Sequence, residues 1–227
     1  MNVFITGANR GIGLGLVKHY LAQGCNVWAT HRSDLGLLSE VHNKQLHLLQ
    51  WEITEEKSES QLNALMLPDT IDLLINNAGV YGSTIGAGQA LDSVTGEAMM
   101  EVFNVDCVGA LRVTQALVSR VIAARGVIAN MSSKMGSSDD NTSGGCYAYR
   151  AAKAALVIVS RSMAVDLAPE GVRVITLHPG WVSTDMTNHS GLIDVATSVA
   201  GLTAVISNVD RYDPGAFIAY DGKVVPY

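Results

Sequence analysis

The sequence predicts an α/β domain built on one doubly wound, mostly parallel sheet, and two observations carry this prediction. Short apolar runs without strict polar alternation, typical of strands buried on both faces, alternate with segments of helical spacing. This order is expected of parallel strands, because they need a crossover and the crossover is normally a right-handed helix. No linker or internal repeat interrupts the 227 residues, so we expect a single domain over residues 1–227.

Seven segments have the composition of buried strands. They are residues 3–6, 26–30, 46–51, 71–76, 126–131, 173–178 and 216–220. Segments of helical spacing follow most of them, at residues 13–23, 35–42, 55–67, 96–124, 147–168 and 194–207. Two stretches rich in glycine, serine or asparagine, 82–89 and 137–145, are expected to be loops. The order therefore predicts a seven-stranded sheet with helices on both faces.

Composition and charge narrow the class of protein. The net charge is −6 without a long basic run, so nucleic-acid binding is not expected. No apolar run stands out as a membrane span, and the N-terminus has no signal-peptide pattern. Three widely spaced cysteines form neither a CxxC nor a Cys/His pattern. We expect a cytoplasmic protein with free thiols, without a metal site and without a membrane partner.

The end of the first strand carries a glycine-rich turn. Residues 6–13 read TGANRGIG and run into an apolar helical pattern. Glycines let backbone amides approach a pyrophosphate, and the helix N-terminus adds a partial positive charge. An ordinary strand–helix loop is the alternative, but the position after the first strand favours a Rossmann-type dinucleotide site. The expected cofactor contacts here are Gly7, Asn9, Arg10, Gly11, Ile12 and Gly13.

The end of the second strand indicates which dinucleotide the turn accepts. An acidic residue there would bind the 2′-hydroxyl of NAD, whereas a basic residue suits the 2′-phosphate of NADP. The strand continues into His31 and Arg32 without a carboxylate, and Arg10 of the glycine turn can reach the same phosphate. A solvated loop charge is the alternative interpretation of Arg32. Because guanidinium groups make bidentate phosphate contacts, we expect NADP(H) as the cofactor.

Two residues on the helix after the fifth strand have the spacing of an acid/base pair. Tyr149 and Lys153 are four residues apart and therefore share one helix face. A free tyrosine has a pKa of about 10, and a neighbouring ammonium stabilises the phenolate and lowers that pKa. Such a pair is usually structural when it stands alone. Here Ser132 and Ser133 follow the fifth strand, at the edge where open α/β sheets bind ligands.

Several motifs in a fixed order carry a resemblance to a known family. They are TGANRGIG, NNAG at 76–79, the helix asparagine at 104, SSxxG at 132–136, YxxxK at 149–153 and PG at 179–180. Over essentially its whole length, the chain resembles the short-chain dehydrogenase/reductase superfamily. Residues 132–156 and the PGWV motif at 179–182 are most similar to the C-factor or sniffer-type carbonyl reductase branch. The resemblance implies a reductase acting on small carbonyl compounds.

The resemblance also implies a role for each matching residue. Tyr149 would be the general acid in reduction and the general base in oxidation, and Ser133 would hydrogen-bond the carbonyl oxygen. Lys153 would bind the nicotinamide ribose, and Asn104 would hold a water for proton relay. The other expected cofactor contacts are His31, Arg32, Glu52, Ile53, Asn77, Ala78, Gly79, Tyr149, Lys153, Pro179, Gly180, Val182 and Thr184.

Three features depart from the family pattern, and one further residue does not belong to its motifs. Glu52 stands where the family usually has aspartate, and the interval between Ser133 and Tyr149 is longer than usual, so its loop must bulge outward. Arg150 follows the tyrosine and is expected to point away from the site. Asp106 lies two residues after the helix asparagine, and we interpret it as a polar residue on a helix face, with a functional role as the alternative.

The predicted substrate pocket lacks a cluster of cations. Its expected walls are Tyr81, Ile85, Met135, Trp181, Met186 and Leu192. Such walls favour neutral, moderately apolar ketones, aldehydes or ketoesters over CoA- or carrier-linked substrates. A signalling protein that keeps the fold and the cofactor but turns over little is the alternative function. The apolar helices 96–124 and 147–168 also predict a homodimer or homotetramer.

Overall fold

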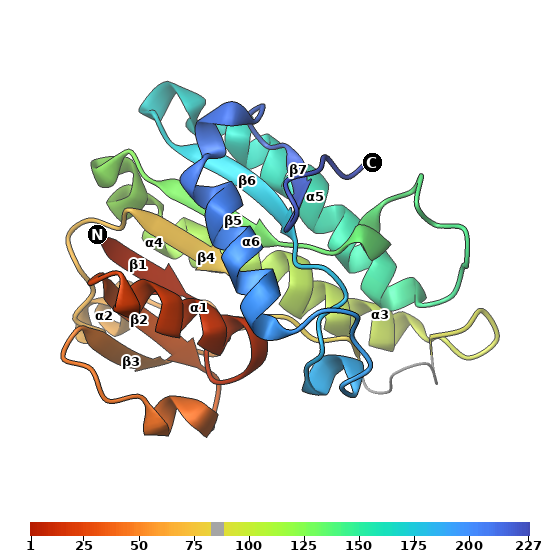
Figure 1. Cartoon of the computed structure of the whole chain (residues 1–227), viewed down its shortest axis with the longest axis horizontal. Coiled ribbons are helices and arrows are strands. Elements are labelled where there is room, and N and C mark those ends of the chain that lie inside the picture. Colours follow the sequence, from red (N-terminus) through yellow and green to blue (C-terminus); the bar gives the residue numbers. More distant parts are fainter. Residues whose placement is uncertain (83–88) are drawn as a thin grey trace.

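A seven-stranded parallel sheet lies at the centre of the computed structural model, which describes residues 1–82 and 89–227 (Figure 1). The strands are β1 Asn2–Ile5, β2 Asn26–His31, β3 Leu46–Gln50, β4 Leu73–Asn76, β5 Val127–Met131, β6 Arg173–His178 and β7 Phe217–Ala219. Their order is β3-β2-β1-β4-β5-β6-β7, and every neighbouring pair is parallel. The predicted doubly wound fold is confirmed, with a sheet that is parallel throughout.

The helices connect consecutive strands and cover both faces of the sheet. The α-helices are α1 Gly11–Ala22, α2 Glu59–Ala64, α3 Gly96–Phe103, α4 Ala110–Ala124, α5 Tyr147–Leu167 and α6 Val195–Ser207. The short helices are η1 Gly36–Glu40, η3 Lys134–Gly136, η4 Ala168–Glu170, η5 Asp185–Thr187 and η6 Val209–Arg211, and a π turn, η2, spans Asn104–Gly109. In Figure 1, α1 and α6 lie on one face of the sheet, and α4 and α5 lie on the other.

Two predicted helices are shorter in the structure, and a third is not one regular α-helix. Residues 35–42 contain only the short η1, in which Leu38 alone is buried. The helix predicted over 55–67 begins at Glu59, because Ser58 forms a capping box with Gln61. The run 96–124 is helical throughout but is interrupted by η2, whose i→i+5 pattern widens one turn.

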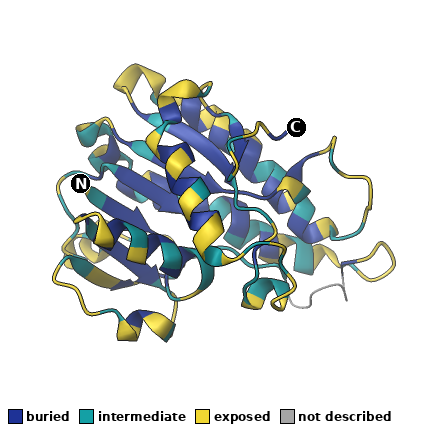
Figure 2. Cartoon of the chain, in the orientation of Figure 1, coloured by how far each residue is buried: buried dark blue, intermediate teal, exposed yellow. Residues whose placement is uncertain are grey.

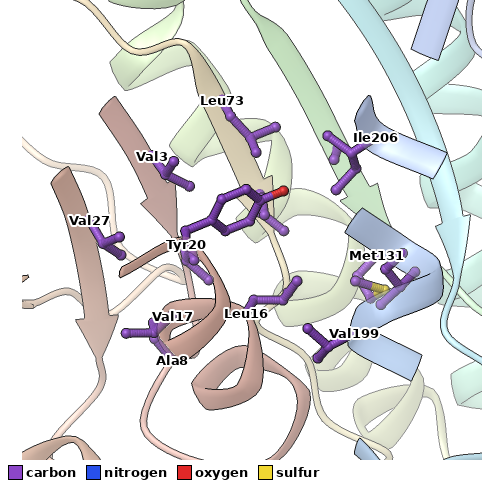
Figure 3. Close-up of a cluster of buried hydrophobic side chains, with 14 of the residues drawn as sticks. Val3, Ala8, Leu16, Val17, Tyr20, Val27, Leu73, Met131, Val199 and Ile206 are labelled. Atoms are coloured by element: carbon purple, nitrogen blue, oxygen red, sulfur yellow. The ribbon is translucent and has the colours of Figure 1, made fainter. Parts of the chain in front are cut away.

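Apolar side chains fill both sides of the sheet. Successive strand residues face opposite sides, so Val3 and Ile5 pack under α1 and α6 whereas Phe4 packs under α4 and α5. Figure 3 shows the first of these layers, in which strand residues meet Leu16 and Val17 of α1 and Val199 of α6. Buried residues form the centre of the sheet, and exposed residues lie on the outer helix faces (Figure 2).

A buried polar network fixes the strands that carry the site. The Asn76 side-chain amide donates to the Thr114 hydroxyl at 3.0 Å and to the Asn130 side-chain oxygen at 2.8 Å. The Asn130 amide donates in turn to the Ser160 hydroxyl at 2.8 Å. These bonds join β4 and β5 to α4 and α5, so the ends of both strands are held against the helix that carries Tyr149.

One helical run has the length and composition of a membrane span, contrary to the sequence expectation. Residues 96–124 reach a mean hydropathy of 1.3 in their most apolar window, of which 39% is buried. Val113, Leu117 and Val121 of this run are fully buried against the sheet. Within this fold, the apolar side of the run is a layer of the core.

Candidate active site

A cavity of about 620 Å³ opens at the carboxyl ends of the central strands. It lies where the strand order reverses between β1 and β4, which is the usual ligand position in doubly wound sheets. Predicted site residues that line it are Gly7, Asn9, Arg10, Gly11, Ile12, Gly13, Arg32, Glu52, Ile53, Asn77, Ala78, Gly79, Asn104, Tyr149, Lys153, Pro179 and Thr184. Segments far apart in sequence, the ends of β1, β2, β3, β4 and β6 together with η2 and α5, thus meet in one cleft.

The glycine turn has the backbone geometry of a pyrophosphate cradle. Gly7 has a φ of +62°, and a Cβ there would lie 2.7 Å from the Ala78 Cα. A Cβ on Gly13 would lie 2.3 Å from the Gly7 carbonyl oxygen. Arg10 is the N-cap of α1, and its side chain makes no capping hydrogen bond to the first amides of that helix. These free donors, together with the helix dipole, suit the phosphates of a dinucleotide.

The turn after β4 is tied to the glycine turn by hydrogen bonds. The Thr6 hydroxyl accepts from the backbone N–H groups of Asn77 and Ala78, each at 3.0 Å. The Asn77 side chain donates to the Thr6 and Gly7 carbonyl oxygens at 3.0 and 2.9 Å. Asn77 therefore holds the floor of the cleft as well as lining it.

The adenosine end of the cleft carries both predicted arginines. Arg32 Nε lies 4.0 Å from the Glu52 carboxylate, and Arg10 Nη1 lies 3.2 Å from that of Asp185. The side chains of Arg10 and Arg32 are 55% and 72% exposed, so both guanidinium groups remain accessible to a phosphate. Glu52 also accepts from the backbone N–H of Thr54 at 3.1 Å.

Three predicted cofactor contacts do not line the cleft. His31 follows Thr30, which does, and alternation along β2 directs the imidazole to the opposite face. Its Nδ1 is buried and has no hydrogen-bond partner among the described residues. Gly180 packs beneath Ile193 and Tyr220, and the Val182 side chain is 3% exposed. These residues form the wall behind the cleft, while Pro179 and Thr184 face it.

Tyr149 and Lys153 lie together at the inner end of the cleft, as the spacing predicts. Lys153 Nζ is 5.6 Å from the centre of the Tyr149 ring and donates to the Met131 carbonyl oxygen at 3.0 Å. The Ser133 hydroxyl lowers the pKa of Tyr149, although Ser133 itself lies just outside the cavity lining. Ser132 is the inner serine of the pair, and its hydroxyl donates to the Lys153 carbonyl oxygen at 2.8 Å.

Burial dominates the acid strength of this tyrosine. It raises the pKa of Tyr149, and the negative charge of Asp106 raises it further, while Lys153 and the Ser133 hydrogen bond lower it. The predicted effect of the lysine is present, but burial outweighs it. Tyr149 is therefore a protonated phenol at neutral pH, the form that can donate a proton.

The π turn carries Asn104, which lines the cleft as expected, and Asp106, which lies elsewhere than the sequence interpretation placed it. The Asn104 side-chain oxygen accepts from Arg112 Nη1 at 2.7 Å, so the amide is held by α4. Asp106 is not a surface residue: its side chain has no solvent exposure and lies 3.1 Å from Lys153 Nζ. The sequence signal that could have found it is its position two residues after Asn104 in the motif NVD.

The substrate side of Tyr149 is formed by the loop after β4 and the start of α5. The Tyr81 ring lies 4.8 Å from that of Tyr149, and its hydroxyl is 2.7 Å from the Cys146 Sγ. Gln89, which the sequence interpretation missed, is buried and accepts from the backbone N–H of Tyr149 at 3.1 Å. Ile85, a predicted wall, lies outside the described residues. Met186 lines the cleft, whereas Trp181, another predicted wall, is half exposed and does not line it.

Arg150 points away from the site, as expected, and organises the bulging loop. Its guanidinium donates to the carbonyl oxygens of Met135 and Gly145, each at 3.2 Å, and to the Ser143 hydroxyl at 2.9 Å. These hydrogen bonds hold the long loop between Ser133 and Tyr149 against η3.

Comparison with known proteins identifies the family to which these features belong. The chain matches the short chain dehydrogenase family over residues 1–192. It belongs to that family. C-signal of Myxococcus xanthus is 43% identical over 159 residues, which cover 69% of this chain and 93% of that protein.

Solved structures agree with this assignment. Carbonyl reductase Sniffer of D. melanogaster superposes with a TM-score of 0.88 at 29% identity, covering 100% of this chain and 99% of that one. An NADPH-bound carbonyl reductase from chicken fatty liver gives 0.85 at 31% identity, covering 100% and 98%. The inferred superfamily and its C-factor or sniffer-like branch are confirmed. The short-chain dehydrogenase described here is a nicotinamide-dependent oxidoreductase.

Proposed function

We propose that this short-chain dehydrogenase is an NADPH-dependent carbonyl reductase for neutral small molecules. The observation that carries the proposal is the pairing of Tyr149 and Lys153, with Ser133 beside the tyrosine, in a cleft that the glycine turn also lines. Glycine turn, acid/base pair and carbonyl-binding hydroxyl are the parts that this reaction needs. The nicotinamide, when bound, supplies the hydride.

The chain's own residues supply the proton and the orientation. Ser133 donates a hydrogen bond to the substrate carbonyl oxygen and orients it toward Tyr149. Tyr149, protonated at neutral pH, then transfers its phenolic proton to that oxygen as the carbonyl becomes an alcohol. Lys153, held by the Met131 carbonyl, is placed to bind the ribose and to stabilise the phenolate that remains.

A panel of carbonyl compounds tests this function directly. Purified protein with NADPH should reduce neutral aryl and alkyl ketones, aldehydes and ketoesters, measured as loss of NADPH absorbance. Two cations of the segment between Ser133 and the start of α5 already have partners: Lys134 Nζ lies 2.7 Å from Asp140, and Arg150 donates to the Met135 carbonyl oxygen and the Ser143 hydroxyl. A carrier- or CoA-linked acetoacetyl substrate that outperforms the neutral compounds would contradict the substrate class.

The alternative of a signalling protein with little turnover is favoured by one observation, the 43% identity to C-signal. The same panel separates the two functions, since a signalling protein would bind NADPH without consuming it. The intact grouping of Tyr149, Lys153 and Ser133 favours the enzyme.

The preference for NADPH should depend on Arg32. Replacing Arg32 by aspartate should lower the affinity for NADPH at least about tenfold and leave that for NADH nearly unchanged, because only NADPH carries the 2′-phosphate. Fluorescence titration with both cofactors measures the ratio. Arg211→Asp is the matched control, since it makes the same charge change at an exposed site away from the cleft. Equal losses for NADPH and NADH would show that Arg32 does not select the cofactor.

An exposed apolar stripe on α5 supports association of the chain with a second copy. Ala151, Ile158 and Val165 are exposed at seven-residue intervals, with Ile158 52% and Val165 62% accessible. Light scattering at micromolar concentration should give at least a dimer, as burying such a stripe removes apolar surface from water. Ile158→Glu/Val165→Glu should give a folded monomer. A monomeric parent protein would refute the proposal.

A further inference from the structure

Asp106 is a buried carboxylate at the inner end of the cleft with two partners. One oxygen lies 3.1 Å from Lys153 Nζ, and the other accepts from the backbone N–H of Val80 at 2.7 Å. The side chains of Asp106 and Lys153 are 0% and 5% exposed. A Cβ on Gly79 would lie 3.2 Å from Lys153 Nζ and 3.3 Å from an Asp106 oxygen. The ion pair is therefore packed directly against the turn that floors the cleft.

Three elements of the fold converge on this carboxylate. Asp106 belongs to the π turn η2, Val80 follows β4, and Lys153 lies on α5. Turns of this kind are rare and often occur at functional sites, because they change which side chains face the neighbouring element. Here the turn gives Lys153 a second fixed partner besides the Met131 carbonyl. The ammonium is thereby held in place before any cofactor binds.

The charges around the pair leave Asp106 as the dominant anion. Among the described residues, the ionisable groups that face Tyr149 and Lys153 are Asp106 and Cys107 from η2 and Tyr81 from the loop after β4. β5 and η3 contribute the uncharged Met131 carbonyl and Ser133 hydroxyl. The cations on the remaining sides have other partners: Arg112 donates a hydrogen bond to Asn104, Arg150 donates one to the Met135 carbonyl oxygen, and Lys134 is ion-paired with Asp140. Glu101 lines the cleft.

A buried pair of opposite charges changes the free energy needed to remove the phenolic proton of Tyr149. With Asp106 ionised, Lys153 and the Tyr149 phenol together make a neutral site, and loss of the phenolic proton leaves an uncompensated buried negative charge. Without that carboxylate, the same proton loss would turn a buried positive site into a neutral one. The carboxylate therefore opposes formation of the phenolate.

We propose that Asp106 is a positioning residue that holds the Lys153 ammonium at the floor of the cleft and keeps Tyr149 a proton donor into alkaline pH, which favours carbonyl reduction. The inference rests on the proposed function and deepens it. The direction of the pKa shifts agrees with the geometry. Burial raises the pKa of Tyr149 and Asp106 raises it further. Burial alone would lower the pKa of Lys153, but Asp106 and Tyr149 hold it above its ordinary value.

The test compares the pH dependence of Asp106→Asn with that of the parent protein. Asparagine keeps the shape and the acceptor for Val80 but removes the charge. The alkaline limb of kcat/KM for reduction should move to lower pH by about one unit or more. Asp106→Glu, which keeps the charge, should retain the parental limb with a lower kcat. Cys107→Ala, an uncharged change in the same π turn, should retain it as well. An unchanged limb in a folded, NADPH-binding Asp106→Asn, or one at higher pH, would overturn the proposal.

A second readout needs no turnover and so separates this inference from the proposed function. Tyrosinate absorbance is measured as a function of pH with NADP⁺ present, for the parent and for the Asp106→Asn protein. The curve of the same protein carrying Tyr149→Phe is subtracted from each, which leaves the signal of Tyr149. That tyrosine should ionise at lower pH when Asp106 is asparagine. A parent protein that reduces no carbonyl compound would refute the proposed function only. Ionisation of Tyr149 at the same or a higher pH in the Asp106→Asn protein would refute the role of Asp106.

Discussion

Replacing Tyr149 by phenylalanine is expected to lower kcat for carbonyl reduction by about 10²–10⁴-fold while leaving the affinity for NADPH within about threefold. The phenylalanine ring keeps the contact with Tyr81 and the packing of the buried tyrosine ring, but it has no proton to transfer. Steady-state kinetics and fluorescence titration measure the two effects separately. The loss should appear in kcat, because the missing interaction is made only in the transition state.

Tyr147→Phe is the matched control for this prediction. Tyr147 lies one half-turn earlier on α5 and is 39% exposed, and its side chain does not line the cleft. Its removal should change kcat less than twofold. Retention of more than about a tenth of the activity by the Tyr149→Phe protein would show that another group donates the proton.

Replacing Lys153 by methionine is expected to impair catalysis, cofactor binding and stability together. Methionine fills a similar volume but leaves the Asp106 carboxylate buried without its cation. Breaking a buried ion pair from one side costs on the order of 3 kcal/mol of unfolding free energy. Denaturant unfolding measures this loss, and kinetics and NADPH titration measure the loss of function, which should be at least about tenfold in each.

The stability loss should depend on pH in a defined direction. Burial raises the pKa of Asp106 and the lysine opposes that rise, so without Lys153 the folded-state pKa lies still further above the unfolded value of 3.8. A raised carboxyl pKa contributes stability that is present at low pH and lost as pH rises through the folded pKa. The deficit of Lys153→Met should therefore be larger at pH 8 than at pH 5.

A double variant distinguishes the structural from the catalytic part of this effect. Lys153→Met/Asp106→Asn removes both charges, so most of the lost stability should return, whereas activity should not. A double variant as unstable as the single one would show that the deficit comes from packing and not from the unpaired carboxylate.

Local patterns in the sequence were sufficient for the elements whose own residues determine them. Except for the largely exposed edge strand β3, the strands are apolar runs buried on both faces, and the glycine turn needs residues without a Cβ at Gly7 and Gly13. Tyr149 and Lys153 share a face because helix periodicity requires it. In these cases the physical cause acts within a few residues, so the sequence determined the outcome.

Helix boundaries depended on contacts between residues that lie far apart in the sequence. The segment 35–42 has helical spacing, yet Gly36 has a φ of +50°, and a Cβ on it would lie 2.8 Å from the Asn9 carbonyl oxygen. That close approach to the glycine turn permits only the short η1. The long run 96–124 is apolar enough for one regular helix, and its pattern carries no sign of the π turn that interrupts it.

The sequence by itself determined the sheet, the nucleotide cradle and the acid/base pair, and hence the family of this short-chain dehydrogenase. Only the tertiary structure decided that the imidazole of His31 faces away from the cleft and that Asp106 is the buried partner of Lys153. The physical reason is that the helix or strand pattern around a residue depends on its neighbours along the chain. Whether its charge is solvated or paired depends on elements that meet only when β4, the π turn and α5 pack together.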